Sequence, residues 1–385
     1  MIHLTNNADC CGCGACANIC PHSAIRMDFD SLGFLYPKVD STKCTDCGLC
    51  NRVCAFNESK ETDVFKTPQA FAARHKNLLE IETSRSGGAF IAFSDWILSQ
   101  NGVVYGAGYS DQFRVVHKRA TTKQEVREFK GSKYVQSDIT SIFSQIKEDL
   151  KREIPVLFSG TPCQTAAISS FIGKEKENLF LIDIICHGVP SPFIWRDYIK
   201  YQERVNHKKI IAVNFRDKTK YGWSSHVESL KFDDGTYLYS DIYSFSFYQH
   251  ISFRPCCANC KYCNLKRPSD ITLGDFWGWE KIDKTFNSDN KGCSLVLCNT
   301  SKGQFLFNNI KQDLRVIPAH MEDCMQDHLK KPSQLHPKYM QFEMDYVKYG
   351  FDYVKKKYFT KSAYIYIRRY LGRLKRWVIR KFKNR

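Results

Sequence analysis

The sequence predicts a mixed α/β protein with a small cysteine-rich N-terminal domain, a larger α/β body and a basic amphipathic helix at the C-terminus. Three observations predict this division. Nine of the 18 cysteines fall within residues 1–54, segments of strand and helix length alternate between residues 70 and 202, and residues 353–385 contain 13 Lys and Arg but no Asp or Glu. Alternating strands and helices favour parallel strands with right-handed crossovers.

The domain boundaries follow the composition of the chain. We expect a cysteine-rich domain over residues 1–58, a linker over 59–68, a body in two parts (69–150 and 151–345) and a tail over 346–385. The linker is polar and ends at Pro68. Hydrophobic patterning predicts strands at 70–74, 103–109, 114–118, 156–159, 179–186, 271–275 and 295–299, and helices at 88–99, 138–151, 162–171 and 192–202. Residues 210–250 are aromatic and are expected to be rich in strands.

Composition excludes several classes of protein. Hydrophobic residues make up 43% of the chain, which is typical of a folded core and not of disorder. We find no apolar stretch of about 18 residues and no signal peptide, so we expect a cytoplasmic protein that does not span the membrane. Eighteen cysteines in that compartment indicate metal or redox chemistry. Much of the net charge of +17 comes from the tail, so we do not expect a nucleic-acid partner.

Two cysteine quartets share one spacing in the N-terminal domain. Each reads C-x2-C-x2-C-x3-C, a pattern in which the first three cysteines bind one cluster and the fourth binds the other. We therefore expect one 4Fe-4S cluster on Cys10, Cys13, Cys16 and Cys54, and a second on Cys44, Cys47, Cys50 and Cys20. The region resembles bacterial two-cluster ferredoxins. Paired zinc sites are the alternative, which the crossed spacing disfavours. Cys11 lies outside the spacing and is interpreted as a small apolar residue.

Two further cysteines lie at predicted strand ends in the body. Thr161 and Pro162 suit the start of a helix, which places Cys163 in a first turn, where the helix dipole stabilises a thiolate. Cys186 ends the next predicted strand, so both thiols are expected at the carboxyl edge of a parallel sheet, where ligands bind. Two thiolates from residues 256–263 would complete a four-thiolate site. Buried structural thiols, or a small zinc site in 256–263, remain the alternatives.

Five motifs then occur in order. They are Ser-Arg-Ser-Gly-Gly at 84–88, Gly-Ser-Lys-Tyr at 131–134, Gly-Thr-Pro-Cys-Gln at 160–164, Cys-His-Gly at 186–188 and Gly-Asp-Phe-Trp-Gly at 274–278. With these motifs the chain resembles the coenzyme F420 hydrogenase/dehydrogenase beta-subunit family, in the bacterial branch with a fused N-terminal ferredoxin domain. The resemblance implies bound FAD, a third 4Fe-4S cluster and an external redox partner. It assigns the third cluster to Cys163, Cys186, Cys257 and Cys260.

The flavin site implied by this resemblance also has a physical rationale. The expected cofactor-binding residues are Ser86, Gly87, Gly88, Ser132, Lys133 and Asp275. Glycines at a helix start suit a pyrophosphate, and a lysine can neutralise a phosphate or favour the anionic reduced flavin. His187 is the candidate catalytic residue, as a proton shuttle to the flavin. The alternative for His187 is a helix cap or a hydrogen bond to the cluster.

The basic tail has an apolar stripe. Its apolar residues recur at steps of three and four, as on one face of a helix, while Lys and Arg mostly occupy the remaining faces; the stripe consists of Tyr364, Ile367, Leu371, Leu374, Val378 and Phe382. Such a helix suits an anionic membrane surface. For a cytoplasmic protein, we expect this to be the inner membrane surface. Docking of the stripe on the body or on a partner is the alternative.

Together these features predict an iron-sulfur flavoprotein oxidoreductase. Electrons would pass between the clusters and FAD, and to or from coenzyme F420, a ferredoxin-like protein or an unidentified organic substrate. FAD is needed because clusters exchange single electrons, whereas most organic acceptors take two. The alternatives are a flavin-free electron-transfer adaptor docked to an enzyme or membrane complex, and an interaction protein whose metal is structural.

Overall fold

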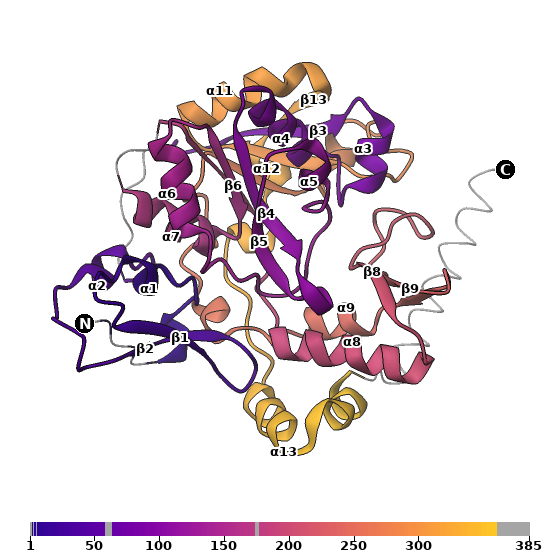
Figure 1. Cartoon of the computed structure of the whole chain (residues 1–385). Helices are drawn as coiled ribbons and strands as arrows, with labels where there is room; N and C mark the ends of the chain where they lie inside the picture. The colour runs from indigo at the N-terminus through magenta and orange to yellow at the C-terminus, as the bar shows by residue number, and fades with distance from the viewer. Residues whose placement is uncertain (1, 3, 5, 58–63, 174–176, 360–385) are drawn as a thin grey trace.

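A computed structural model describes residues 2, 4, 6–57, 64–173 and 177–359 (Figure 1). The N-terminal lobe consists of the short helices α1 (Ala15–Ile19) and α2 (Leu49–Val53) and the antiparallel hairpin of β1 (Ile25–Phe29) and β2 (Leu35–Val39). Both helices begin after a glycine in the left-handed conformation, Gly14 at φ 78° and Gly48 at φ 75°. The two cysteine quartets therefore repeat in backbone conformation as well as in spacing.

A mixed eight-stranded sheet forms the centre of the body. Its strands are β3 (Gln69–His75), β4 (Val103–Tyr109), β5 (Val115–Ala120), β6 (Val156–Gly160), β7 (Leu179–Ile184), β11 (Ile271–Asp275), β12 (Ser294–Cys298) and β13 (Leu314–Ala319), in the order β13-β3-β12-β11-β7-β6-β4-β5. The four central strands β11, β7, β6 and β4 are parallel, and the outer pairs are antiparallel. The predicted mixed α/β class is confirmed. One sheet runs through both predicted parts of the body.

Helices cover both faces of this sheet. On one face lie α4 (Ala89–Ser99) and α11 (Ser301–Ile310), and on the other lie α6 (Phe143–Lys151) and α7 (Pro162–Ile172). Alternate residues of β4 divide between the two cores: Val104 packs with the α4 side, and Val103 and Tyr105 pack with the α6 and α7 side. The shorter helices are α3 (Leu78–Thr83), α5 (Lys123–Arg127), α10 (Trp279–Ile282) and α12 (Met321–Cys324).

A second, aromatic core lies beside the sheet. It is built from the antiparallel strands β8 (Ile210–Asn214), β9 (Glu228–Phe232) and β10 (Tyr237–Ser240) and from the helices α8 (Pro192–Asn206), α9 (Ile242–Tyr248) and α13 (Tyr339–Tyr358). The rings of Trp195 and Tyr243 meet edge to face at its centre, with centroids 5.0 Å apart. Phe351, Val354 and Tyr358 of α13 are buried here, so the first part of the predicted tail packs on the body. The predicted basic helix over 364–382 lies outside the described residues.

Two predicted elements differ from the structure. The helix expected over 138–151 begins at Phe143, because Asp138 instead bonds with its backbone to β5 and with its side chain to Thr140. The strand-rich segment 210–250 also contains α9, whose first turn is held by hydrogen bonds from Tyr243 and Ser244 to the buried Glu228 carboxylate. No described helix is long and apolar enough to span a membrane.

Candidate redox site

The N-terminal cysteines gather around α1 and α2. Cys16 lies close enough to Cys10 and Cys54 for their charges to interact, although Cys54 belongs to the second quartet. Cys20 packs with Cys50 in the same small core. Backbone N–H groups donate to two of the sulfurs, from Gly12 to Cys10 and from Ala24 to Cys20, both at 3.3 Å. Cys13, Cys44 and Cys47 lie in the loops before the two helices. The fourth cysteine of each quartet thus lies near members of both quartets.

A second group of cysteines lies at the carboxyl edge of the sheet. Cys163 lies in the first turn of α7, and Cys186 lies two residues beyond β7. Cys186 is electrostatically coupled to Cys163 and Cys260, and backbone N–H groups of Gly188 and Val189 donate to the sulfurs of Cys186 and Cys257, both at 3.4 Å. Of the four expected ligands, Cys163, Cys186 and Cys260 therefore lie together, with Cys257 on the adjoining loop.

Residues 256–263 present more thiols than a single site needs. The thiol of Cys256 contacts that of Cys257, and the thiol of Cys260 contacts that of Cys263. The structure therefore places Cys256 and Cys263 beside the two ligands that the resemblance assigns from this loop. Within the described residues, no three His, Cys, Asp or Glu side chains converge where a single metal ion would be held.

Cys11 joins the two cysteine groups. It is buried, and its thiol contacts the thiols of both Cys13 and Cys163. Cys13 is an expected ligand of the N-terminal clusters, and Cys163 is an expected ligand of the third cluster. The sequence offered no signal for this role, because the contact joins residues 152 positions apart by tertiary packing alone. The thiol of Cys11 thus contacts one expected ligand of each group.

Arg254 fixes the N-terminal lobe to the body at the same junction. It is fully buried, and its guanidinium donates to the carbonyl oxygens of Cys10 at 2.8 Å and Leu35 at 2.9 Å and to Oε1 of Gln136 at 3.0 Å. Gln136 in turn donates to the carbonyl of Cys11 at 2.8 Å. A Cβ at Gly12 would lie 2.6 Å from Arg254 Nη1, so the close approach requires glycine there.

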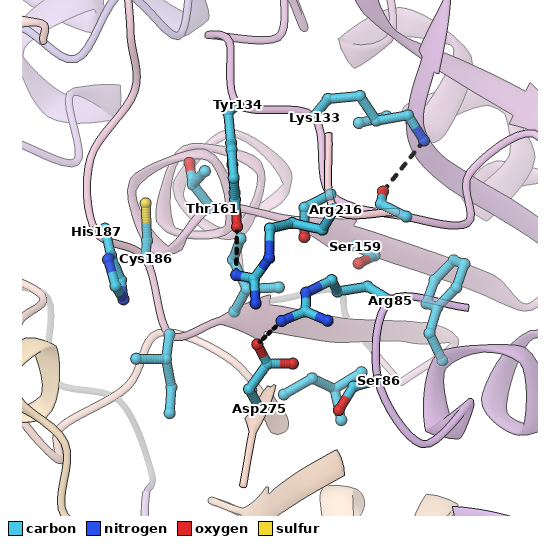
Figure 2. Close-up of a pocket in the computed structure, with 18 of the residues that line it drawn as sticks. Arg85, Ser86, Lys133, Tyr134, Ser159, Thr161, Cys186, His187, Arg216 and Asp275 are labelled. Carbon is cyan, nitrogen blue, oxygen red and sulfur yellow. Dashed lines mark hydrogen bonds and ion pairs between the residues drawn. The ribbon is translucent and has the colours of Figure 1, made fainter. Parts of the chain in front are cut away.

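A cavity of about 480 Å³ opens next to the body cysteines (Figure 2). It lies at the carboxyl ends of β6, β7 and β11 and reaches the N-terminus of α4. Its lining includes Ser86, Gly88, Ser132, Lys133 and Asp275 of the expected flavin residues, together with Cys186 and His187. The segments that carry these residues are far apart in the sequence. The cavity therefore gathers the expected flavin site and one expected ligand of the third cluster around a single space.

Two family models match parts of the chain. Residues 155–322 match the family model for the C terminus of the coenzyme F420 hydrogenase/dehydrogenase beta subunit, and residues 9–57 match a 4Fe-4S dicluster domain. Residues 155–322 are therefore similar to the F420 hydrogenase/dehydrogenase beta-subunit family. The predicted resemblance is confirmed over these two stretches, and the 4Fe-4S match supports iron-sulfur clusters in the N-terminal domain.

A solved structure is also similar. It is a chain from the xenon-derivatised F420-reducing [NiFe] hydrogenase complex of Methanosarcina barkeri, with 15% identity, a TM-score of 0.45, and coverage of 78% of this chain and 94% of that chain. No curated protein matches the chain.

The Ser-Arg-Ser-Gly-Gly motif, which we expect to bind flavin, is partly occupied by contacts within the protein. The N–H of Gly87 donates to Ser294 Oγ at 2.9 Å, and the Ser86 hydroxyl donates to the carbonyl of Cys293 at 2.6 Å. Gly87 does not line the cavity, whereas Gly88, at φ 84°, turns the chain into α4. The N–H groups that face the cavity therefore belong to the turn after Gly87.

Lys133 lies against backbone carbonyls. Its ammonium group donates to the carbonyl oxygens of Glu128 at 2.9 Å, Lys130 at 3.0 Å and Gly131 at 3.4 Å. Burial lowers its pKa from 10.5 to about 7, because desolvation disfavours the charged form. The side chain lines the cavity, but its charge is already engaged by these carbonyls.

Two arginines in the cavity were not predicted from the sequence. Arg85 forms an ion pair with Asp275 at 2.7 Å, and the indole N–H of Trp223 also donates to Asp275, at 3.3 Å. Arg216 extends from the loop after β8 and donates to the hydroxyl of Tyr134 at 3.1 Å (Figure 2). Arg85 lies within the Ser-Arg-Ser-Gly-Gly motif, so the sequence could have indicated that it lines the cavity. Arg216 has no local pattern that distinguishes it from other loop arginines.

His187 lies on the cavity wall in its neutral form. Burial lowers its pKa to about 3, and nearby His328 contributes to the lowering, with ring centroids 4.0 Å apart. Its backbone carbonyl accepts a hydrogen bond from the Ser333 hydroxyl. His117 is a second buried imidazole in the lining: its Nε2 lies 2.9 Å from the carbonyl of Ser159, and its Nδ1 lies 2.7 Å from Ser137 Oγ. A carbonyl only accepts, so Nε2 carries the proton and Nδ1 accepts from Ser137.

Proposed function

We propose that the protein is an iron-sulfur flavoprotein oxidoreductase. It relays electrons between three 4Fe-4S clusters and FAD, and exchanges them with coenzyme F420, a ferredoxin-like protein or another organic substrate. The observation that carries this proposal is the 480 Å³ cavity, where Ser132, Gly88 and Asp275 share one space with Cys186 and His187. An electron-transfer cofactor in this space would lie directly beside the body cysteines.

The lining of the cavity fits a flavin. Its volume lies within the range of about 300–1,000 Å³ that is typical of cofactor sites. The first residues of α4, Ala89 and Phe90, line it, so the positive end of an eleven-residue helix faces the space where a pyrophosphate would be held. Arg85, Lys130 and Lys133 also line this space, although Asp275 and Glu80 balance the charges of the first two. These groups are of the type that binds a phosphorylated, partly apolar cofactor.

Each expected flavin residue has a separate proposed role. Gly88 and Ser86 shape the turn before α4, and Gly87 allows that turn to lie against β3 and β12. Ser132 is proposed to donate a hydrogen bond to the cofactor. Lys133 would contact it by exchanging one of its three carbonyl acceptors for the ligand. Asp275 orients Arg85 through their ion pair.

The cysteine sets are proposed as the cluster ligands assigned above. Cys163, Cys186, Cys257 and Cys260 would hold the third cluster, between the N-terminal quartets and the cavity. Bound FAD would supply the conversion between one-electron and two-electron transfer. His187 is proposed to move protons at the cavity wall; because its pKa is lowered to about 3, its imidazole is neutral at rest and gives up a proton readily once protonated.

The proposal is tested by measuring iron, acid-labile sulfide and flavin per chain after anaerobic purification. Three 4Fe-4S clusters and one FAD predict about 12 iron atoms and one flavin per chain. Iron without flavin would support the flavin-free adaptor instead. Metal that cannot be reversibly reduced would support a structural role and contradict both electron-transfer functions.

A further inference from the structure

The cavity holds one positive charge that no carboxylate balances. Its lining contains four basic side chains, Arg85, Lys130, Lys133 and Arg216, and a single carboxylate, Asp275, all among the described residues. Arg85 pairs with Asp275, and Lys130 pairs with Glu80. Lys133 lies against three carbonyls, with its pKa lowered to about 7. Arg216 forms no ion pair with any described residue. The charge of Asp275 acts on Arg216 as well as on Arg85, so the two arginines share one carboxylate and one positive charge is left over.

Arg216 is buried and held in place by neutral acceptors. Only 5% of its surface is exposed. Its Nε donates to the carbonyl of Ser225 at 2.9 Å and its Nη2 to the carbonyl of Trp223 at 3.3 Å. Its Nη1 donates to the hydroxyls of Tyr134 at 3.1 Å and Tyr248 at 3.4 Å. Burying a charge without an ion-pair partner of its own is costly, and such a site favours a ligand that supplies a counter-ion.

Tyr134 and Tyr248 provide a hydrogen-bond donor beside the Arg216 guanidinium. Both hydroxyls accept from Arg216, and they also hydrogen-bond to each other. Each hydroxyl has one hydrogen, and the bond between them uses one of the two. The other hydrogen is directed away from the guanidinium and can be donated to an anion. Arg216 and the tyrosine pair thus combine a fixed positive charge with one O–H donor.

This charge lies near the opening of the cavity. Tyr248, which accepts from Arg216, is 39% exposed, and Trp277 on the lining is 40% exposed. The Trp277 ring stacks on Trp223 with centroids 4.4 Å apart, and the carbonyl of Trp223 is itself an acceptor of Arg216. The ring centroid of His226 lies 4.8 Å from that of Tyr248. The opening is therefore bordered by aromatic rings, with the arginine just inside.

We propose that Arg216, with the hydroxyls of Tyr134 and Tyr248, binds the carboxylate or phosphate group of an acidic organic redox substrate. The substrate would enter between Tyr248 and Trp277 and lay its organic part on the Trp277 ring. This inference rests on the proposed oxidoreductase function, because it names the substrate class of the same cavity. The phosphates of FAD are the other source of an oxyanion. For those we propose the N-terminus of α4, whereas Arg216 bonds to Tyr248, which is 39% exposed.

The test uses the purified full-length protein and two probes, inorganic phosphate and acetate, each titrated at constant ionic strength. Binding is followed by tryptophan fluorescence, because Trp223 and Trp277 lie at the site. We expect saturable binding of at least one probe, weakened tenfold or more by Arg216→Gln, with unchanged FAD per chain. Arg204→Gln removes the same charge from the exposed surface of α8 and should leave binding unchanged.

A second variant should change the affinity for the anion in the opposite direction. Asp275→Asn removes the only carboxylate of the described lining and should tighten binding, whereas a purely structural disturbance would weaken it. This variant decides the matter if Arg216→Gln fails to retain iron. Absent saturation in the wild type, equal binding by Arg216→Gln, or loss of FAD from Arg216→Gln would each overturn the proposal. A wild-type protein without FAD would instead contradict the proposed function, and the phosphate titration would still test the anion site.

Discussion

Arg254 donates from Nε to the carbonyl oxygen of Cys10 at 2.8 Å, across 244 positions of sequence. This bond joins the loop of the third cysteine group to the first cysteine of the N-terminal lobe. The same loop donates from the Tyr262 hydroxyl to the carbonyl of Ala55 at 2.7 Å, and from the Lys261 ammonium group to the carbonyl of Phe56. The two cysteine groups are therefore held together by side chains from one loop, which fixes their separation.

Replacing Arg254 should loosen this junction. Arg254→Met leaves the carbonyls of Cys10 and Leu35 and the amide of Gln136 without their donor in a buried place, which we expect to cost at least about 3 kcal/mol. The thermal unfolding midpoint should fall, and protease should cut more readily within 57–68. Arg26→Gln, a change at an exposed arginine of the same lobe, should alter neither. Unchanged protease resistance in Arg254→Met would contradict the role of this residue.

Loss of a body cysteine should remove one cluster. We expect Cys163→Ala and Cys186→Ala each to lower iron from about 12 to about 8 atoms per chain, because the N-terminal quartets remain complete. Flavin reduction by the clusters should also slow. Cys298→Ala alters a buried thiol of β12 in a different core and should keep the full iron content. Full iron in both of the first two variants would contradict the third cluster.

The sequence predicted the elements whose signals are local. The strand over 103–109 has the predicted bounds, and α7 begins at Pro162 with Thr161 as its cap, as helix-start preferences indicate. The cysteine quartets were recognised because cluster ligands follow a short, fixed spacing. These features depend on neighbours within a few positions, so a single sequence contains them.

The sequence did not predict the contacts that depend on tertiary packing. Cys11 was interpreted as a spare apolar residue, yet its thiol touches Cys163. Lys133 matched the family motif, but burial directs its ammonium group to three carbonyls. Arg216 and Arg254 are buried by segments distant in sequence. The local sequence does not distinguish a buried arginine from one exposed to solvent. Charge balance in a cavity becomes visible only when those segments are brought together.

Gly87 should be essential for FAD binding at the turn before α4. A Cβ there would lie 2.2 Å from the carbonyl of Ala73 and 2.7 Å from the backbone nitrogen of Ser294, neither of which can move without shifting the sheet. We expect Gly87→Ala to cost about 2 kcal/mol or more and to lower FAD per chain, with iron unchanged. Gly108→Ala, whose Cβ would meet mainly the flexible Lys118 side chain at 3.3 Å, is the control. Equal FAD in both variants would contradict this role.

The basic tail should be responsible for any binding to anionic membranes. Deleting residues 360–385 removes most of its basic residues but keeps Val354 and Tyr358, which a cut at 353 would strip from the aromatic core. We expect the shortened protein to lose binding to anionic liposomes, each basic residue having contributed roughly 1 kcal/mol of attraction. Iron and flavin per chain should not change. Equal liposome binding by the two proteins would reject the membrane role and favour docking on the body or a partner.

His117 should make the stability of the protein depend on pH. Burial lowers its pKa from 6.5 to about 4, so below pH 6.5 the unfolded chain takes up a proton that the folded chain does not. Stability is therefore complete above pH 6.5 and falls as the pH drops toward 4, by about 2 kcal/mol between pH 7.5 and pH 5 from this group. Urea unfolding midpoints at these two pH values measure the loss. His117→Gln cannot titrate and should reduce the pH dependence by that amount, whereas the exposed His22→Gln should leave it intact. An equal pH dependence in His117→Gln and the wild type would show that His117 is not buried in its neutral form.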